Sequence, residues 1–334
     1  MIVSENLCRD FKVYAREPGF RAVVKSFFKR SYTINPAVRN FNLNVDGPEL
    51  IGLLGPNGSG KTTLMKMFTG IIIPSSGSLK ILGDNPWRRK NDFKKNISLV
   101  MGQKSQLWWD IPVMDSLLLF QKYYEIEESQ FKKRVSDLGE RLEVMKLLHI
   151  PVRKLSLGER MKMELMACLL HEPKIIFLDE PTIGLDIRSQ KNVREFLKDY
   201  YEKKKPLIIL TSHYMADVEA LCKRIVLITK GEKQFDGKME DFRKLLQTEK
   251  TIVFNFHQPV SFRPAEWENR FHCEWSGDNL QLKVRLPEEK LKDLTVEVLN
   301  RCPVSDFHTE KVSIEEIMDK VLSNPALLSK QGFS

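Results

Sequence analysis

Residues 50–68 of the chain read LIGLLGPNGSGKTTLMKMF, and the glycine-rich middle of this stretch decides the fold. It fits the pattern G-x-x-x-x-G-K-[ST], in which backbone N–H groups cradle phosphate oxygens. The matching residues are Gly55, Pro56, Asn57, Gly58, Ser59, Gly60, Lys61, Thr62 and Thr63. Residues 49–54 predict a buried strand before the loop, and the residues after it predict a helix through about Phe68. The pattern requires this order of strand, loop and helix.

Each residue type in this loop suits phosphate binding. Glycines let the backbone curl around phosphate oxygens, and the N-terminus of the following helix adds positive potential. We expect Lys61 to reach the β- and γ-phosphates of a nucleotide, Thr62 to ligate Mg²⁺ and Thr63 to approach the α-phosphate. The alternative is an ordinary glycine-rich turn, which the combination of strand, lysine and threonines disfavours.

A pair of acids follows a second apolar strand, predicted at residues 174–178. Asp179 and Glu180 are costly at the end of a buried strand unless they have a role. Ligands gather at the carboxyl ends of strands in open α/β sheets. Asp179 fits the Mg²⁺-associated acid of phosphate-loop enzymes, and Glu180 would then act on a water near the γ-phosphate. The alternative is two solvated acids that open a loop, which the nearby phosphate loop makes less attractive.

The chain up to about residue 240 alternates short apolar runs with charged helical patterns, which is typical of an α/β parallel sheet covered by helices. Candidate buried strands are residues 50–54, 97–101, 174–178, 207–210 and 225–229. Lys230 and Gly231 then predict a turn. From about residue 245 the pattern changes to alternating strands at 251–256 and 280–286, with helical patterns at 288–300 and 313–322. Ser313 and Glu316 fit a capping box. This tail predicts a small α+β domain.

Composition narrows the class of protein. The 334 residues allow about two domains, and 42% hydrophobic with 29% charged residues exclude global disorder. No apolar run reaches the roughly 18 residues of a transmembrane helix, and the first residues lack the apolar core of a signal peptide, so a cytosolic location is expected. Five scattered cysteines without a C-x-x-C pair argue against a disulfide framework or a zinc site. The net charge of +9 favours an acidic partner.

The series of motifs along the first 240 residues resembles the nucleotide-binding subunit of an ABC transporter. In chain order the matching positions are the phosphate loop, Gln103, residues 155–159, Asp179, Glu180, residues 184–186 and His213. The most specific stretch is residues 155–186, LSLGERMKMELMACLLHEPKIIFLDEPTIGLD. Within the family the chain looks most like the ATPases of daunorubicin-resistance-type exporters and related uncharacterised systems, which pair with separately encoded permeases.

This resemblance implies a P-loop NTPase fold with a RecA-like core, a helical subdomain at about residues 104–172 and a small antiparallel β subdomain. Residues 1–240 would form this ATPase domain, and residues 241–334 an α+β accessory domain. It also implies a head-to-tail homodimer in the ATP-bound state, with two Mg-ATP molecules between the subunits.

The resemblance further implies roles for individual residues. Ser156, with Gly158, would contact the γ-phosphate held by the opposite subunit. Gln103 would touch Mg²⁺ or the attacking water, His213 would hydrogen-bond the γ-phosphate, and Asp186 would communicate between the two sites. Phe11 is the candidate for stacking on adenine, with Tyr14 in reserve.

Most of these residues also have a structural explanation. Ser156 and Glu159 fit a capping box, which needs no ligand. Gln103 also fits a solvated loop residue, which its place after the 97–101 strand disfavours, and a lone histidine such as His213 is usually structural. The spacing of 23 positions from Ser156 to Asp179, and the place of His213 at a strand end, favour the functional interpretation.

Two residues depart from the usual Leu-Ser-Gly-Gly-Gln signature of the family. Leu157 replaces the first glycine and cannot take a positive φ cheaply. Glu159 replaces the glutamine and places a negative charge where ATP is expected. Both changes put in doubt how tightly the dimer binds ATP and how fast it hydrolyses it. They put the existence of the site in less doubt.

Each of two further segments fits two interpretations. Residues 107–112, LWWDIP, are apolar for a loop and fit either core packing or a socket for a permease helix. Residues 18–39 are basic, with Phe20, Val23, Val24, Phe27 and Phe28 at helical spacing. They fit a helix at a membrane or permease surface, or, slightly preferred, a helix packed on its own domain.

The expected function is therefore ATP binding and hydrolysis that powers transport, with export favoured, through a separate permease at the cytoplasmic face of the membrane. Glu180, His213, Gln103 and Lys61 would carry the chemistry. One rival is a soluble ABC ATPase that acts on nucleic acid or ribosomes, but the single phosphate loop and the lack of long coiled coils count against a nucleic-acid partner. The other rival is a regulatory subunit that binds ATP without hydrolysing it, suggested by Leu157 and Glu159.

Overall fold

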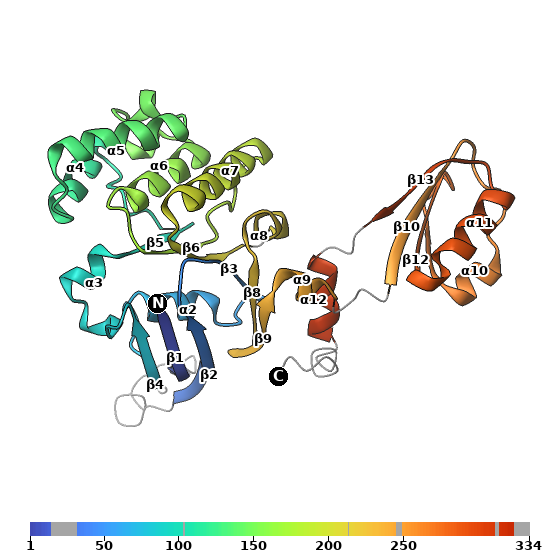
Figure 1. The fold of residues 1–334 in the computed structure, drawn as a ribbon, viewed down its shortest axis with the longest axis horizontal. Helices are drawn as coiled ribbons and strands as arrows, with labels where there is room; N and C mark the ends of the chain where they lie inside the picture. The colour runs from blue at the N-terminus through green and yellow to red at the C-terminus, as the bar shows by residue number, and fades with distance from the viewer. Residues whose placement is uncertain (15–31, 103, 213, 245–248, 311–313, 324–334) are drawn as a thin grey trace, which may run out of the picture. The chain divides into compact units, whose positions relative to one another are not determined.

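The computed structural model describes residues 1–334 apart from 15–31, 103, 213, 245–248, 311–313 and 324–334 (Figure 1). The chain divides into two compact units, Met1–Met239 and Glu240–Phe333. Each unit has its own sheets and buried residues, and each is described by itself.

The first unit is built on a mostly parallel sheet of order β5-β6-β7-β3-β8-β9. The bounds are β3 Leu50–Leu54, β5 Ile97–Met101, β6 Ile175–Asp179, β7 Leu207–Thr211, β8 Arg224–Thr229 and β9 Glu232–Lys238. Only β8 and β9 pair antiparallel. All residues of β3, β6 and β7 are buried. Because strands buried on both faces read as continuous apolar runs, the predicted strands are confirmed, with ends shifted by at most one residue.

Helices precede and follow the strands of this sheet. Their bounds are α2 Lys61–Phe68, α3 Asn91–Lys95, α4 Val113–Tyr123, α5 Glu128–Arg141, α6 Leu157–Leu169, α7 Ile187–Lys204 and α8 Met215–Leu221. Short 3-10 turns lie at Pro86–Arg88, Met145–Leu147 and Val152–Lys154. Helices α4, α5 and α6, drawn in green in Figure 1, lie together between β5 and β6 in the sequence. The predicted helix after the phosphate loop is confirmed as α2.

A separate antiparallel sheet of order β2-β1-β4 completes the first unit. It contains β1 Ile2–Tyr14, β2 Tyr32–Val45 and β4 Ser76–Ile81. The expectation of one basic helical insert over residues 18–39 is wrong at its end, because residues from Tyr32 onward pair with β1 as strand β2. The apolar residues that suggested a helix, from Phe20 to Phe28, lie outside the described residues.

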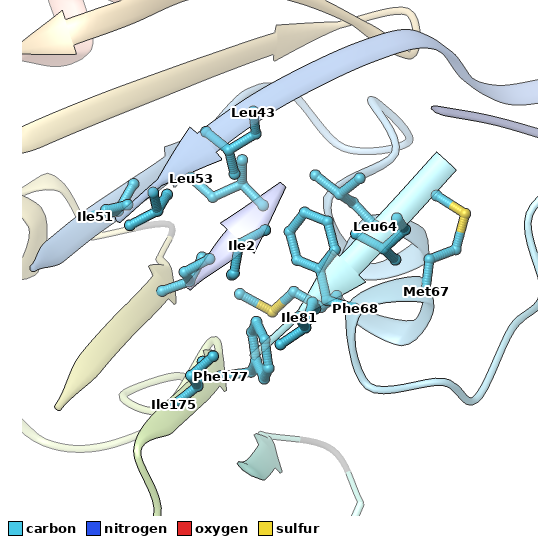
Figure 2. Packing of buried hydrophobic residues seen from close by; sticks show 14 of the residues in the cluster. Ile2, Leu43, Ile51, Leu53, Leu64, Met67, Phe68, Ile81, Ile175 and Phe177 are labelled. Atoms are coloured by element: carbon cyan, nitrogen blue, oxygen red, sulfur yellow. The ribbon is translucent and has the colours of Figure 1, made fainter. Parts of the chain in front are cut away.

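Helix α2 packs between the two sheets of this unit, as Figure 2 shows. The ring of Phe68 lies 6.3 Å from that of Phe41 on β2 and 5.9 Å from that of Phe177 on β6, measured between centroids. All three side chains are fully buried. Truncating a buried phenylalanine to alanine costs about 3–5 kcal/mol. This packing therefore fixes the helix that follows the phosphate loop.

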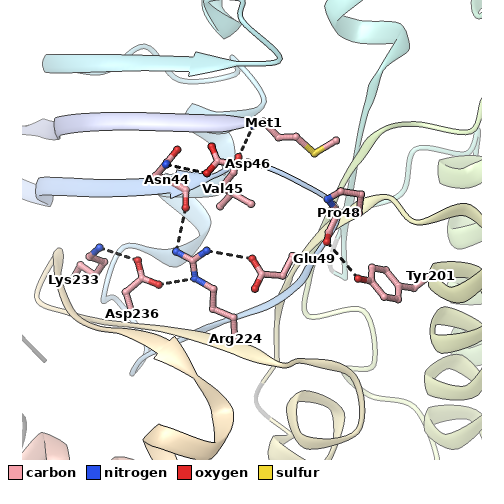
Figure 3. A network of polar contacts seen from close by, with 10 residues as sticks. All are labelled: Met1, Asn44, Val45, Asp46, Pro48, Glu49, Tyr201, Arg224, Lys233 and Asp236. Atoms are coloured by element: carbon pink, nitrogen blue, oxygen red, sulfur yellow. Dashed lines mark hydrogen bonds and ion pairs between the residues drawn. The ribbon is translucent and has the colours of Figure 1, made fainter.

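A polar network, drawn in Figure 3, also ties the antiparallel sheet to the central sheet. The guanidinium of Arg224, at the start of β8, donates to Asp236 on β9 at 2.7 Å and to Glu49 before β3 at 3.2 Å. It also donates to the carbonyl of Asn44 near the end of β2 at 3.2 Å. The Arg224 side chain therefore bonds both to the end of β2 and to the residue immediately before β3.

The second unit is an α+β fold in the order β-α-β-β-α-β, a ferredoxin-like pattern. Its elements are β10 Glu249–Phe256, α10 Ala265–Arg270, β11 His272–Trp275, β12 Gln281–Pro287, α11 Leu291–Arg301 and β13 Val304–Glu310, with α9 Met239–Lys244 before and α12 Ile314–Ser323 after. The antiparallel sheet has the order β11-β12-β10-β13. Trp267 of α10 and Leu294 and Val298 of α11 share one core with this sheet. Ser313, of the predicted capping box, lies outside the described residues.

Candidate active site

The phosphate loop lies between β3 and α2 in a conformation that only glycine adopts without strain. Gly55 has φ 148° and Gly60 has φ 107°. A Cβ at Gly55 would lie 2.1 Å from the carbonyl oxygen of Ile228, and a Cβ at Gly60 would lie 2.4 Å from that of Ala37. The loop is therefore in close contact with strands β8 and β2, and neither glycine can gain a side chain.

The loop presents polar groups that suit a bound anion. Gly60 is the N-cap of α2 and the helix has no side-chain cap, so its first N–H groups have the geometry of an anion site. The hydroxyl of Ser59 is buried and has no hydrogen-bond partner among the described residues. Because an unpaired buried hydroxyl is costly, the loop fits a ligand that supplies an oxygen.

Lys61 is the charged group of this loop. Its side chain is only 7% exposed, and its ammonium donates to the carbonyls of Gly55 at 2.6 Å and Pro56 at 3.0 Å. Burial lowers the pKa of Lys61, while the charges of Glu180 and Asp179 oppose that effect. Since carbonyls do not neutralise an ammonium, a phosphate group is the ligand that this cation fits.

Asp179 ends strand β6 and is held by the neighbouring strand. Its carboxylate accepts a hydrogen bond of 2.7 Å from the hydroxyl of Thr211, which is completely buried at the end of β7. Thr62 lies half-buried in the first turn of α2. A carboxylate and a threonine hydroxyl are oxygen ligands of the kind that Mg²⁺ prefers. These two residues fit the expected metal.

Glu180 has a strained backbone. Its φ is 57°, in the left-handed region, which costs a non-glycine residue roughly 1–2 kcal/mol. Its N–H donates to the carbonyl and the hydroxyl of Thr211, both at 3.1 Å. Gly102 lies against it, because a Cβ there would come within 2.5 Å of the Glu180 carbonyl oxygen. A strained residue held this way is typical of a functional site.

The start of helix α6 confirms the predicted capping box. The backbone N–H and the hydroxyl of Ser156 both donate to the Glu159 carboxylate at 2.8 Å, and the Glu159 N–H donates back to the hydroxyl at 3.3 Å. These hydrogen bonds, first that from the Ser156 hydroxyl, lower the pKa of Glu159. Glu159 is therefore ionised at neutral pH and caps its own helix.

The structure places no backbone strain at Leu157. Leu157 is the first helical residue of α6 and is absent from the described residues with positive φ. The positive φ, 70°, belongs instead to Gly184. A Cβ at Gly184 would lie 2.6 Å from a methyl carbon of Leu157. The leucine therefore packs against the loop that follows Glu180.

Asp186 ends that loop and caps helix α7. It accepts hydrogen bonds from the N–H of Ser189 at 2.9 Å and from its hydroxyl at 2.7 Å, and the N–H bond is the main cause of its lowered pKa. A Cβ at Gly158 would lie 3.2 Å from the Ser189 hydroxyl. The starts of α6 and α7 are thus brought together within one subunit.

Comparisons with known proteins agree with this geometry. The family model described as "ABC transporter" matches residues 38–183. The chain is 31% identical over 229 residues to ABC transporter ATP-binding protein NatA of Bacillus subtilis, covering 69% of this chain and 92% of that protein. The chain belongs to the ABC transporter ATP-binding proteins. It is an ATP-binding subunit of the ABC ATPase family, with the P-loop NTPase fold.

A further relative and two solved structures are also similar to this ABC ATPase. It is 33% identical over 210 residues to Nod factor export ATP-binding protein I of Cupriavidus metallidurans, covering 63% of this chain and 69% of that protein. Two solved structures share its fold. One is an ATP-binding subunit of an ABC transporter, with a TM-score of 0.60, 21% identity and 73% and 92% coverage of the two chains. The other is a dimeric cassette in a post-hydrolysis state bound to ADP and Pi, with a TM-score of 0.59, 20% identity and 72% and 99% coverage.

Four predicted residues of the ABC ATPase are either outside the described residues or only partly placed. Gln103 and His213 lie outside the described residues, as does the side chain of Tyr14. Phe11 is half-buried on β1, and the guanidinium of Arg9 lies 4.8 Å from the centre of its ring. One face of that ring is therefore already covered by a cation, and its stacking on adenine stays a prediction.

Several buried polar residues around the site were not predicted from the sequence. They are Glu164, Thr182, Thr211, Ser212 and Asp217. Thr211 and Ser212 follow the apolar run 207–210 as Asp179 and Glu180 follow 174–178, so the same strand-end signal identifies them in retrospect. Within the described part of the ABC ATPase, no helix has both the length and the apolar composition to span a membrane.

Proposed function

We propose that this ATP-binding subunit drives export through a separate membrane-spanning permease, to which it binds at the cytoplasmic face. The observation that supports nucleotide binding is the buried ammonium of Lys61. The negative charges of Glu180 and Asp179 lie close enough to raise its pKa against the effect of burial. The export part is supported by the name of a relative, Nod factor export ATP-binding protein I. The finer likeness to daunorubicin-type ATPases stays a prediction.

The residues of one subunit have distinct proposed roles in hydrolysis. Lys61 and the N–H groups of the phosphate loop would bind the β- and γ-phosphates, and Thr62 and Asp179 would hold Mg²⁺, which neutralises phosphate charge when bound. Glu180 would accept a proton from the attacking water. Gln103 and His213 are proposed to contact the metal or water and the γ-phosphate, respectively.

A homodimer would complete each site. The proposal is that Ser156 and Gly158 reach the γ-phosphate held by the opposite subunit, and that Asp186 communicates between the two sites. The dimeric state of a solved cassette with this fold supports the arrangement. In the described structure the Ser156 hydroxyl donates to Glu159, so it would have to redirect this hydrogen bond to the phosphate.

An exposed aromatic surface supports a protein partner. Trp108 and Trp109 are each 50% exposed, and Leu118 and Leu119 of α4 are more than 40% exposed. The guanidinium of Arg160 lies 5.6 Å from the centre of the Trp109 ring. Aromatic and arginine side chains are enriched at interfaces. We propose these residues as the permease contact, in preference to core packing.

The test of hydrolysis is Glu180→Gln. The variant should bind Mg-ATP like the wild type but hydrolyse it at least about 100-fold more slowly, because a general base contributes roughly 10²–10⁴ to the rate. Phosphate release and nucleotide affinity are measured on the same preparations. Glu202→Gln is the matched control, since Glu202 pairs with Lys205 on the surface at the end of α7. Full turnover by Glu180→Gln would refute the assignment.

A regulatory subunit that binds ATP without hydrolysing it is the second candidate, and Glu159 is the observation that favours it. Its carboxylate stays charged beside Ser156. ATPase assays of the complex co-purified with its membrane partner distinguish the two candidates. Co-purification with RNA or DNA in place of a membrane protein would instead support the alternative function, a soluble ABC ATPase that acts on nucleic acid or ribosomes.

A further inference from the structure

Asp217 is a buried carboxylate without an assigned role. It lies in the first turn of α8 and is 1% exposed. Among the described residues, its carboxylate accepts hydrogen bonds from three side chains: the hydroxyl of Thr182, the hydroxyl of Ser212 at 2.7 Å, and the guanidinium of Arg194 at 2.7 Å. These donors come from the loop after β6, the loop after β7, and helix α7. Asp217 is thus the meeting point of separate chain segments.

The two loop hydroxyls meet at a single atom. Thr182 and Ser212 both donate to Oδ2 of Asp217, while Arg194 donates to Oδ1. Thr182 and Ser212 are themselves buried, at 2% and 6% exposure. A buried ion pair contributes little to net stability compared with apolar packing. The hydrogen bonds to Asp217 instead fix the positions of the three donor side chains.

Both loops that Asp217 holds belong to the hydrolytic site. Thr182 follows Glu180 by two residues. Ser212 follows Thr211, whose hydroxyl bonds the Asp179 carboxylate and the Glu180 N–H. The Ser212 hydroxyl also accepts a 3.0 Å hydrogen bond from the N–H of Tyr214, so the residues on both sides of position 213 are held. The phosphate loop contributes no donor to Asp217.

We propose that Asp217 is a positioning residue for ATP hydrolysis, which holds the loop that follows Glu180 in one fixed arrangement against Ser212 at the end of β7. This inference rests on the proposed role of Glu180. A displacement of about 1 Å in a reacting group can cost 100-fold in rate. Loss of the Asp217 carboxylate should therefore lower kcat, while ATP affinity, set by the phosphate loop, stays unchanged.

The test is Asp217→Asn, which keeps the size of the side chain but places an N–H₂ group toward one of its donors. We expect kcat to fall at least tenfold, with the dissociation constant for Mg-ATP within twofold of wild type. Glu297→Gln is the matched control, because Glu297 of the second unit also accepts from two side chains, Trp267 at 2.9 Å and Arg301 at 3.0 Å. It should leave both constants unchanged.

Milder variants keep the proposal testable if Asp217→Asn does not fold. Thr182→Val and Ser212→Ala each remove one donor, and each should lower kcat about threefold or more without changing ATP affinity, by losing a hydrogen bond to a charged group. Wild-type kcat in both variants would overturn the proposal. So would a loss of affinity that parallels the loss of kcat, because this would indicate a merely structural role.

The double variant Glu180→Gln/Asp217→Asn separates this inference from the proposed function. If Asp217 acts through Glu180, the double variant should have the same residual kcat as Glu180→Gln alone. Losses that multiply would overturn the inference. Full turnover by Glu180→Gln refutes the role of Glu180, whereas a slow Glu180→Gln with an unaffected Asp217→Asn refutes the inference only.

Discussion

At the residue scale, Glu159 combines two opposing effects. Its carboxylate caps helix α6 through Ser156, and an anion at a helix N-terminus is favourable. The same charge opposes any phosphate brought to that helix end. The sequence predicts both effects, but only the structure shows that the Ser156 hydroxyl already donates to this carboxylate.

Glu159→Gln should therefore strengthen ATP binding in the dimer. The amide oxygen can still accept from Ser156, while the variant removes a like-charge repulsion of about 0.4–1 kcal/mol, as for unit charges roughly 4–10 Å apart in water. The half-saturating ATP concentration should therefore fall about two- to fivefold. Because hydrogen bonding lowers the pKa of Glu159, the carboxylate is ionised above its unfolded pKa of about 4.3. The ratio of variant to wild type should thus be constant from pH 6 to 8.

The measurement is ATPase rate against ATP concentration. The control is Glu127→Gln, another acid that caps a helix, since its side chain accepts from Ser129 and Gln130 at the start of α5. Equal half-saturation in Glu159→Gln and wild type would show that the charge is not near the bound phosphate.

At the element scale, helix α6 is joined to the loop that follows position 103. Glu164 is 3% exposed, accepts from the hydroxyl of Ser105, and accepts from the N–H of Gln106 at 3.0 and 3.2 Å. Burial raises its pKa, and the hydrogen bond from Ser105 opposes this. The side chain of Gln106 donates to the carbonyl of Leu99 on β5 at 2.8 Å. This loop therefore links the helical part of the unit to the central sheet.

Glu164→Ala should loosen this loop, because the N–H of Gln106 loses its acceptor, and a typical hydrogen bond contributes about 0.5–1.5 kcal/mol. Glu164→Gln should retain most of the protection, since an amide oxygen can still accept from it. Amide hydrogen exchange over residues 105–109 measures the effect. Glu128→Ala on α5, which removes a surface ion pair with Lys132, is the control. Unchanged exchange in Glu164→Ala would contradict the linkage.

The strands of the central sheet could be predicted because each is a continuous apolar run with sharp ends, as at Leu50–Leu54. The phosphate loop and the Asp179–Glu180 pair could be predicted because their residues are adjacent in sequence. Asp217 and Thr182 could not, since they are 35 residues apart and meet only when β6 and β7 are neighbours. The start of β2 was missed because its first residues are exposed and carry no apolar run.

At the scale of the whole molecule, the two units have separate cores. The first contains Phe68 and Phe177, and the second contains Trp267 and Leu294. All residues of this chain that are proposed to bind the nucleotide belong to the first unit, Met1–Met239. Ligand binding stabilises only the folded region that binds it, by about 2.7 kcal/mol at 100 times the dissociation constant.

Leu294→Ala should accordingly destabilise the second unit by about 2–5 kcal/mol, because the side chain is 1% exposed. Mg-ATP affinity should not change. Hydrogen exchange over residues 249–310, with and without Mg-ATP, measures the first effect, and nucleotide titration measures the second. A large loss of ATP affinity in Leu294→Ala would show that the second unit supports the nucleotide site.

The contact between Leu157 and Gly184 has an evolutionary consequence. The methyl group of Leu157 occupies the space that a side chain at position 184 would need. At a φ of 70°, any side chain at 184 is also strained by the backbone, so a smaller residue at 157 would not make position 184 tolerant of one. We expect position 184 to stay glycine among relatives while position 157 varies, because the backbone alone selects against a side chain at 184.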